Sequence, residues 1–414
     1  METMIPSSAY LHIPFCRRRC YYCDFPISVL GDKTDINTSL SIQNYVDILC
    51  QEIQVTPSYN VPLKTVFFGG GTPSLLSPVY LEKILTTLAQ HFGISSDAEI
   101  SLEMDPGTFT LQQLQSYKNL GVNRFSLGIQ VFQDELLEKC GRFHRLKDIE
   151  NAINLIHQVN IDNFSLDLIS GLPYQTLEAW QFSLEKAIEI NPKHLSCYDL
   201  VLEPVTAFGK QYKPGKFPLP QDEIAAQMYR LTQQILTNAG YEHYEISNYA
   251  KSGYQCLHNR VYWENKPYYA FGMGAASYTN QQRFTRPRTR QTYYDWVEEL
   301  LKSNYFIDSP YLTNIDHLLE TFMLGLRLSD GVDSSKIVAQ FGKEIMPRIY
   351  QKLCPYIQQQ WVELIDTNGH IISNINDNKW GELTKIRLTD PDGFLVSNTI
   401  LATLFEEFES DSKQ

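Results

Sequence analysis

The sequence predicts an α/β protein whose strands and helices alternate along the first half of the chain, followed by a smaller, mostly helical unit. Between residue 9 and about residue 202, short apolar runs alternate with stretches in which apolar residues recur at helical spacing. Repeated strand–helix units of this kind form a parallel sheet, either open or curled into a full or partial barrel. A further observation, polar residues on one face of three strands, favours the barrel.

The alternating part of the chain contains six expected strands and five expected helices. The predicted strands are residues 9–13, 65–68, 99–104, 123–129, 163–169 and 195–201. The predicted helices lie near residues 39–55, 78–92, 110–120, 147–159 and 176–190. The second of these helices shows the pattern well, because its leucines and isoleucine recur three and four residues apart.

The third, fourth and fifth predicted strands alternate apolar with polar side chains. Parallel strands that are covered on both sides are normally apolar on both faces. Helices outside and polar residues inside therefore fit a barrel that holds a ligand. Glu103, Gln130 and Asp167 would then lie near the C-terminal strand ends, where such barrels place their active sites. Polar groups that satisfy one another inside the barrel are the alternative.

The pattern changes after about residue 205. A proline-rich loop precedes a helix at 221–239, and an aromatic and glycine-rich stretch follows. A smaller unit begins near residue 310, with an amphipathic helix that ends at Gly331, which predicts a winged-helix-like accessory domain. Its other predicted elements are a helix at 344–360, strands at 362–365 and 371–373, and a helix at 395–408. The expected domains are residues 1–240, 241–309 and 310–414.

Composition and charge exclude several classes of protein. Hydrophobic residues make up 43% and charged residues 20% of the chain, which is typical of a globular protein. The net charge of −12 gives no general attraction for a phosphate backbone, so we expect no nucleic-acid partner. No apolar run is long enough for a membrane span, which leaves peripheral membrane contact open. The N-terminal residues lack signal-peptide features, and we expect a cytoplasmic protein.

Three of the eight cysteines, Cys16, Cys20 and Cys23, lie in the loop after the first predicted strand. Structural zinc normally uses two separate pairs of ligands, and the sequence has no second pair. A disulfide would leave one thiol over and does not suit a reducing compartment. A [4Fe–4S] cluster held by three thiolates leaves one iron for an exogenous chelator, such as the amine and carboxylate of an amino acid. The other five cysteines are expected to be small buried hydrophobic residues.

This Cys-x3-Cys-x2-Cys spacing resembles that of the radical SAM superfamily. In that superfamily, S-adenosylmethionine (SAM) bound at the open iron is cleaved reductively to a 5′-deoxyadenosyl radical. The run Gly69-Gly-Gly-Thr-Pro73 also resembles the superfamily motif that binds the SAM amino group. Its backbone N–H groups and missing side chains would let a charged ligand approach closely. A tight strand-to-helix turn without a ligand is the alternative.

At finer grain the chain resembles the oxygen-independent coproporphyrinogen III oxidase family, which includes a branch of heme chaperones. The matching stretches are 10–25, 68–74, 101–106, 126–132, 141–145, 167–176, 198–206, 245–278 and 388–405. The resemblance implies an incomplete (β/α)6 radical SAM barrel followed by the family's C-terminal domain. It also implies a [4Fe–4S] cluster and SAM as cofactors. The implied SAM contacts are Tyr10, Tyr22, Gly70, Gly71, Thr72, Glu103, Gln130, Arg142 and Asp167.

Two departures from the decarboxylating oxidases favour the heme-chaperone branch. Those enzymes carry a further cysteine where this chain has Phe25, and they have a long N-terminal extension before the cluster. The segment from His258 to Trp263 matches the HNxxYW motif associated with heme binding in the chaperones. Imidazole is a common axial ligand of heme iron, and the aromatic residues could stack on a porphyrin. An ordinary buried histidine is the alternative, and Ala276 replaces a histidine found in many relatives.

The resemblance thus implies a chaperone that binds heme and passes it to an acceptor protein, with the cluster and SAM in a structural or regulatory role. Decarboxylation of coproporphyrinogen III, or a radical SAM reaction on another tetrapyrrole, is the alternative. The Arg17–Arg19 run would either shield the cluster or dock an electron donor. Four further arginines would attract propionates or an acidic partner, or would form a solvated loop: Arg283, Arg286, Arg288 and Arg290.

Overall fold

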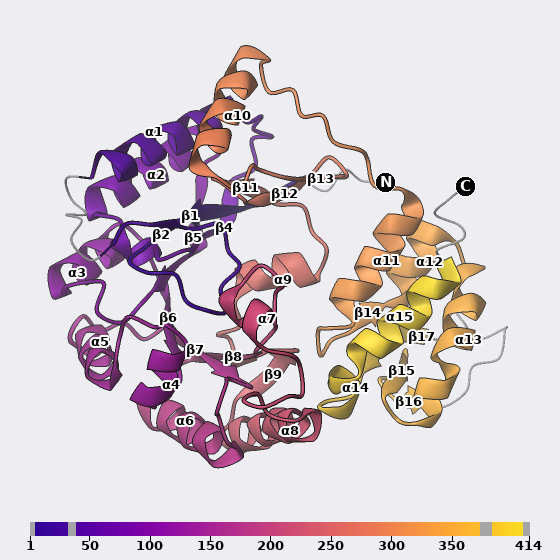
Figure 1. The fold of residues 1–414 in the computed structure, drawn as a ribbon. Helices are drawn as coiled ribbons and strands as arrows, with labels where there is room; N and C mark the ends of the chain where they lie inside the picture. The colour runs from indigo at the N-terminus through magenta and orange to yellow at the C-terminus, as the bar shows by residue number, and fades with distance from the viewer. Residues whose placement is uncertain (1–4, 32–38, 373–382, 409–414) are drawn as a thin grey trace.

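A large open sheet with helices around its outer side forms most of the molecule, and a smaller C-terminal unit lies beside it (Figure 1). The computed structural model describes residues 5–31, 39–372 and 383–408. Two hydrophobic cores, one for each unit, contain most of the buried apolar side chains. Among the described residues, no helix combines the length and apolar character needed to cross a membrane.

Six parallel strands lie side by side in chain order at the centre of the sheet. They are β1 (Ser8–Ile13), β4 (Leu63–Gly70), β5 (Ile94–Met104), β6 (Arg124–Gln130), β7 (Phe164–Ser170) and β8 (His194–Asp199). All six strands expected from the sequence are confirmed. The largest difference is at β5, which begins five residues earlier than predicted, in a polar stretch that carries no strand pattern.

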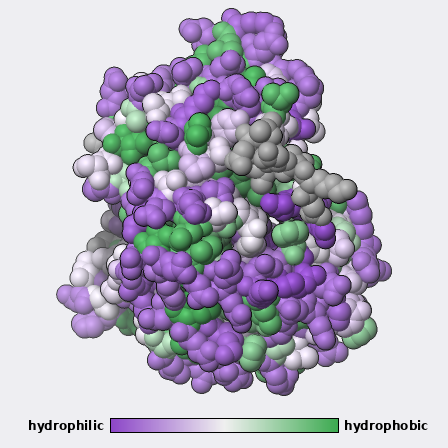
Figure 2. All heavy atoms as spheres, turned by 90° about the vertical axis from the view of Figure 1, so that its left-hand side faces the viewer, coloured by the Kyte–Doolittle hydropathy of each residue, from purple (hydrophilic) through white to green (hydrophobic). Residues whose placement is uncertain are grey.

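The five expected helices are also confirmed, and they cover the outer side of the sheet (Figure 1). They are α1 (Leu40–Val55), α2 (Pro78–His91), α3 (Leu111–Asn119), α5 (Leu146–Gln158) and α6 (Leu177–Ile190), with a short α4 (Asp134–Lys139) and a 3₁₀ turn, η2 (Pro73–Leu75), added. In α5, Ile149, Ala152, Ile153 and Ile156 form the buried stripe. The outer face of these helices is mainly hydrophilic with separate apolar patches (Figure 2).

Residues 241–309, expected as a separate segment, contribute strands to both edges of the large sheet. Two strands continue it antiparallel beyond β8, and a third pairs parallel with β1 at the opposite edge. They are β10 (Asn248–Ala250), β9 (Glu242–Glu245) and β11 (Tyr269–Phe271). Within the described residues no pairing joins the two edge strands, so the nine-stranded sheet is an incomplete barrel, as predicted.

Shorter elements connect these strands. Before β9 come α7 (Ala207–Gln211) and the predicted long helix α8 (Asp222–Asn238). After β10 come α9 (Leu257–Trp263), the hairpin β12 (Ala276–Thr279) and β13 (Gln282–Thr285), and α10 (Arg290–Lys302). Near the N-terminus, β2 (Phe15–Cys16) and β3 (Ser28–Val29) form a small parallel pair around the three clustered cysteines.

The C-terminal unit packs helices against a four-stranded sheet, in agreement with the predicted mostly helical domain. Its helices are α11 (Asn314–Gly325), α12 (Ser334–Phe341), α13 (Ile345–Gln358), α14 (Asp392–Leu395) and α15 (Ser397–Phe408), and its strands are β14 (Val332–Asp333), β15 (Val362–Asp366), β16 (Ile371–Ile372) and β17 (Leu383–Leu388). Four elements of this unit were not predicted from the sequence: α12, α14, β14 and β17. The prediction that the first helix reaches Gly331 is wrong, because α11 ends at Gly325 and the chain returns as β14. Residue 373, the predicted end of the second strand, lies outside the described residues.

A buried ion pair ties α1 to the chain before α10. Arg286 Nε donates to Glu52 Oε1 at 2.7 Å, and both side chains are at most 1% exposed. The other carboxylate oxygen of Glu52 accepts from the Gly272 N–H at 2.9 Å and from the Tyr293 hydroxyl at 2.6 Å. This carboxylate therefore joins α1 to three residues that follow it by 220 to 241 positions in the sequence.

The sequence predicted a basic patch of four arginines, and this prediction is wrong for two of them, Arg283 and Arg286. Arg286 belongs to the buried pair with Glu52, and Arg283 pairs with Glu320 of α11 at 2.9 Å. Arg288 remains exposed and donates to the Asp24 carbonyl at 2.7 Å, and Arg290 donates to Ser41. The four side chains therefore do not form one continuous patch. Arg288 also lines a cavity on the inner face of the large sheet, so its attraction for carboxylate groups stays a prediction.

We predict that Arg286→Met lowers the free energy of unfolding by about 3–5 kcal/mol, because it leaves the Glu52 charge buried without its cation. Chemical denaturation followed by circular dichroism measures this loss. The double variant Glu52→Gln, Arg286→Met should lose less, since no unpaired charge remains. Lys302→Ala, which removes an exposed cation, serves as the control and should leave stability nearly unchanged. A wild-type stability for Arg286→Met would contradict the role assigned to the pair.

Candidate functional site

The inner face of the large sheet lines a cavity of about 420 Å³. Its walls come from β1, β4, β5, β6, β7, β8 and α9, so strands and a helix far apart in the sequence meet there. This volume lies in the range of roughly 300–1,000 Å³ that is common for small-molecule sites. Tyr10, Gly70, Glu103, Asp167 and His258, all proposed from the sequence as ligand contacts, line it.

Two carboxyl groups, those of Glu103 and Asp167, line this cavity close enough for the charge of one to act on the other. Glu103 Oε2 accepts from the Gly70 N–H at 3.0 Å, and Asp167 accepts from the Ser126 hydroxyl at 3.0 Å. Burial, and secondarily the charge of Asp167, raises the pKa of Glu103 to about 8. Burial also raises the pKa of Asp167, although hydrogen bonds from Ser196 and Ser126 act in the opposite direction. Glu103 can therefore hold a proton near neutral pH and donate it to a ligand oxygen.

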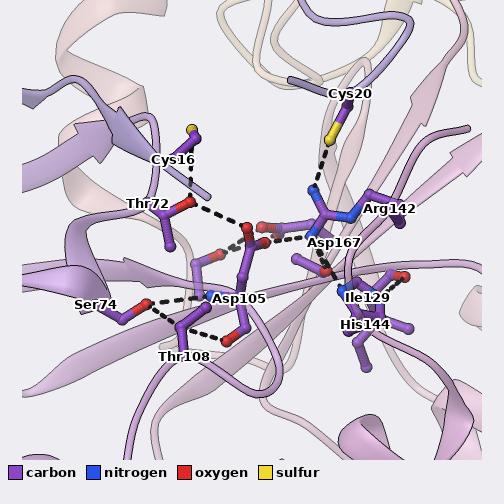
Figure 3. A network of polar contacts seen from close by, with 12 residues as sticks. Cys16, Cys20, Thr72, Ser74, Asp105, Thr108, Ile129, Arg142, His144 and Asp167 are labelled. Carbon is purple, nitrogen blue, oxygen red and sulfur yellow. Dashed lines mark hydrogen bonds and ion pairs between the residues drawn. The ribbon is translucent and has the colours of Figure 1, made fainter. Parts of the chain in front are cut away.

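The three clustered cysteines lie half-buried in the loop after β1 as free thiols. Thr72 Oγ1 lies 3.6 Å from Cys16 Sγ, and Arg142 Nη1 lies 3.5 Å from Cys20 Sγ, each as a donor (Figure 3). Over the part of the chain that the structure describes, no three His, Cys, Asp or Glu side chains converge as ligands of a single ion. In a [4Fe–4S] cubane each thiolate binds a separate iron, whereas a zinc site needs all of its ligands on one ion. The three thiols of this loop therefore fit an iron–sulfur cluster better than a zinc ion.

Burial raises the pKa of the Cys16 thiol to about 12 and that of the Cys23 thiol to about 11. A bare thiolate is therefore unfavourable at both positions, because the surroundings do not replace its hydration. Bound iron would supply the missing positive charge, since a coordinating thiol is deprotonated outright. The donor set thus fits a cationic cluster.

Asp105 connects the two groups that contact the cysteine sulfurs. Its carboxylate accepts from Thr72 Oγ1 at 3.1 Å and pairs with Arg142 Nη2 (Figure 3). Arg142 Nη2 also donates to the Gly128 carbonyl at 2.9 Å. The sequence analysis did not select Asp105 as a site residue. Strand alternation could have pointed to Asp105, because it follows Glu103 by two positions and therefore shares its face of the strand.

The glycine motif packs directly against the cysteine loop. The Gly71 N–H donates to the Ile13 carbonyl and the Thr72 N–H to the Phe15 carbonyl, each at 2.8 Å. A Cβ at Gly71 would lie 2.7 Å from the Pro14 carbonyl carbon, which leaves room only for glycine. The expectation that these N–H groups are free for a ligand is wrong at positions 70, 71 and 72, because protein oxygens already accept from all three.

The remaining predicted SAM contacts lie on the cysteine side of the site. Thr72 and Arg142 line a second, smaller pocket together with Cys20. Gln130 sits at a bulge between β6 and β7 with φ of 72°, and its amide lies beside Gly128, close to Arg142. Tyr22 is half-buried in the cysteine loop, within the field of Arg142 and Cys20. The predicted contacts therefore form two adjoining groups, one in the cavity and one at the cysteines.

His258 on α9 is buried and hydrogen-bonded at both ring nitrogens. Its Nδ1 lies 2.7 Å from Thr65 Oγ1 and its Nε2 lies 2.8 Å from the Tyr262 hydroxyl. Burial, and secondarily the charge of Arg124, lowers the pKa of His258 to about 3, so the imidazole is neutral. Tyr262 lines the cavity beside it, whereas Trp263 does not and lies 5.9 Å from the Arg327 guanidinium.

Comparison with known proteins agrees with this arrangement. The family model for the radical SAM superfamily matches residues 10–187, and that for the HemN C-terminal domain matches residues 312–370. A solved structure titled as coproporphyrinogen III oxidase (HemN) from Escherichia coli, a radical SAM enzyme, superposes with a TM-score of 0.78 at 24% identity, over 97% of this chain and 90% of that chain. The fold is therefore that of a radical SAM protein.

Relatives of similar sequence narrow the class further. The protein from Synechocystis sp. named heme chaperone HemW is 48% identical over 99% of this chain and 98% of its own length. The proteins of the same name from Bacillus subtilis and Escherichia coli are 36% and 35% identical, over 82% and 83% of this chain and 88% of their own lengths in both cases. This chain belongs to the HemW family of heme chaperones.

We predict that Glu103 makes stability depend on pH in the cluster-free, SAM-free protein. Its folded-state pKa of about 8 exceeds that of the unfolded chain, so its contribution is present at low pH and is lost as the pH rises through about 8. Between about pH 5.5 and about pH 8.5, the wild type should lose up to about 3 kcal/mol more unfolding free energy than Glu103→Gln.

Denaturation at a series of pH values measures this difference. Glu223→Gln, which changes an exposed carboxylate on α8, should follow the wild type and serves as the matched control. The assignment fails if Glu103→Gln and the wild type show the same dependence on pH.

Proposed function

We propose that the protein binds heme and transfers it to an acceptor protein, and that it carries a [4Fe–4S] cluster and SAM. The observation that carries this proposal is the 48% identity, over nearly the full length of both chains, to a protein named as a heme chaperone. An oxygen-independent coproporphyrinogen III oxidase, or a radical SAM reaction on another tetrapyrrole, remains the alternative. Phe25 argues against the oxidase, because it stands where the oxidases carry a further cysteine.

Cys16, Cys20 and Cys23 would hold the cluster, and SAM would occupy the adjoining cavity. When bound, these groups supply a redox-active iron centre and a cleavable sulfonium. The carboxyl groups of Glu103 and Asp167 suit ribose hydroxyls, since each can exchange hydrogen bonds with them. Arg142 would place an N–H donor and its positive charge beside the sulfur of Cys20.

Heme would approach the aromatic side of the same cavity. Phe67, Tyr262 and Tyr268 line this side around His258, and such rings can stack on a porphyrin. The low pKa of His258 keeps a nitrogen lone pair unprotonated, as iron ligation requires. Coordination through Nε2 would replace its hydrogen bond to Tyr262.

The proposed partners are heme and a heme-acceptor protein of unknown identity, and an electron donor that reduces the cluster. The guanidinium groups of Arg17 and Arg18 lie near the ring of Phe143, with their carbons 5.5 Å and 5.6 Å from the ring centroid. These cations lie within the cysteine loop, between Cys16 and Cys20, where a reductant would approach. We propose a cytoplasmic protein without a nucleic-acid partner, and peripheral membrane contact is compatible with it.

We predict about four irons and four sulfides per chain in protein reconstituted without oxygen, and loss of this content when Cys16, Cys20 and Cys23 are all changed to alanine. Iron and sulfide analysis with the visible absorption spectrum measures the content. Cys140→Ala removes a buried thiol near the same loop, and Cys354→Ser a remote one. Both controls should keep the cluster. A triple variant that retains about four irons would contradict the ligand assignment.

We predict that the wild type binds heme and forms no protoporphyrinogen from coproporphyrinogen III. A heme titration followed at the Soret band should show weaker binding for His258→Ala, because an imidazole ligand is lost. Trp263→Ala, on the same helix but outside the cavity, should titrate like the wild type. Tyr262→Phe should retain the imidazole-type spectrum, because it frees Nε2 without removing the ring.

An anaerobic assay with coproporphyrinogen III completes this test. Efficient product formation would support the oxidase instead. Heme affinity that does not depend on His258 would place the axial ligand at another residue.

A further inference from the structure

Arg124 is a buried cation at the inner end of the cavity that no step above uses. It is the first residue of β6, it is 2% exposed, and it lines the cavity with Ser126, Asp167 and Ser196. Side-chain alternation places it on the same face of β6 as Ser126. It was not selected from the sequence because it stands at the start of the strand, away from the C-terminal strand ends.

The guanidinium of Arg124 lacks a direct partner. Its Nε is buried without a hydrogen-bond acceptor, and within the described ranges no hydrogen bond or ion pair engages the rest of the group. The carboxylates of Glu99 and Asp167 act on it only through space. Glu99 instead accepts from the N–H groups of Leu257 and His258, at 3.1 Å and 3.0 Å. Buried charges in proteins are normally hydrogen-bonded, so this one is incomplete.

The other buried arginine of the site shows the contrast. Arg142 donates to Cys20 Sγ, to Asp105 and to the Gly128 carbonyl. Protein groups therefore use both of its terminal nitrogens, and only its Nε is, like that of Arg124, without an acceptor. Arg124 combines the same burial with unused donors that face an open cavity. The serine next to it across the strands, Ser101, also has a buried hydroxyl without a partner.

We propose that Arg124 binds a carboxylate of the ligand that occupies the inner end of the cavity. A guanidinium presents parallel N–H donors that match the two oxygens of a carboxylate, and a charge-assisted pair of this kind is strong in a site shielded from water. The Phe67, Tyr262 and Tyr268 rings beside it accommodate the flat, apolar part of such a ligand.

Two molecules named above carry a suitable carboxylate. One is heme, through a propionate, and this source rests on the proposed function. The other is SAM, if its methionine carboxylate binds Arg124 rather than the open iron of the cluster. In both cases a carboxylate of the ligand pairs with Arg124. Heme and SAM give different results in a binding experiment.

The test compares full-length wild type, Arg124→Gln and Arg230→Gln, all reconstituted with the cluster. Arg230 is half-exposed on α8 and pairs with Asp392, so its variant is a matched loss of one positive charge outside the cavity. Circular dichroism and thermal unfolding verify that each variant is folded. Each protein is titrated with heme, with heme dimethyl ester, which lacks the carboxylates, and with SAM, followed by the EPR signal of the reduced cluster.

If the carboxylate belongs to heme, the wild type prefers heme to its dimethyl ester by roughly tenfold or more, and Arg124→Gln abolishes the preference while its response to SAM stays normal. If it belongs to SAM, Arg124→Gln weakens SAM binding by a similar factor and leaves the two hemes unchanged. Arg230→Gln should match the wild type throughout.

Equal heme, ester and SAM affinities in the wild type and Arg124→Gln would overturn the proposal while leaving heme binding itself intact. Absence of heme binding by the wild type would instead overturn the proposed function, and the SAM titration would then decide the role of Arg124. If Arg124→Gln unfolds, Arg124→Lys keeps the charge and loses the bidentate geometry. That variant should show an intermediate preference, and a full wild-type preference would count against the carboxylate.

Discussion

Two backbone hydrogen bonds, from Gly71 to Ile13 and from Thr72 to Phe15, hold the site together. They continue the pairing of β1 with β4 beyond the end of the sheet and fasten the glycine turn to the start of the cysteine loop. Only a residue without a Cβ permits this approach at position 71. The position of Cys16 relative to Thr72, and through Thr72 relative to Asp105, follows from this contact.

The site concentrates buried charge, and most of it is compensated by specific partners. Asp105 neutralises Arg142 beside Cys20, and the serines around Asp167 donate hydrogen bonds to its carboxylate. Glu103 is compensated less well, which is why its pKa rises to about 8. Polar networks in a low-dielectric interior are costly when incomplete, so their incompletely satisfied members are candidate contacts for a ligand. On the cavity side these members are Arg124, whose Nε has no acceptor, and Glu103, which accepts from the Gly70 N–H.

One cavity brings together residues that the sequence assigned to two different ligands. Glu103 and Asp167, expected at SAM, and His258, expected at heme, all line it. The parallel order of β4 to β8 places the first two, and α9, which packs against β4, adds the third. In a heme chaperone with this geometry, the cluster side and the heme side of the site would share a wall. This arrangement offers a direct physical route by which one ligand could influence the other.

The sequence by itself determined the features that rest on local patterns. Apolar runs and helical spacing identified the six central strands and the five outer helices, and strand alternation put Glu103 and Asp167 inside. The spacing of Cys16, Cys20 and Cys23 predicted a cluster loop, because the ligands of one loop are close in sequence, and the match of residues 10–187 to the radical SAM family model supports that prediction. Only the tertiary structure decided that β11 joins β1, that Arg286 is buried on Glu52 and that both nitrogens of His258 are engaged. Arg286 and Glu52 are 234 residues apart, and His258 and Thr65 are 193 residues apart, so no local periodicity records these contacts. Only Tyr262, four residues from His258 on the same helix, is a local partner.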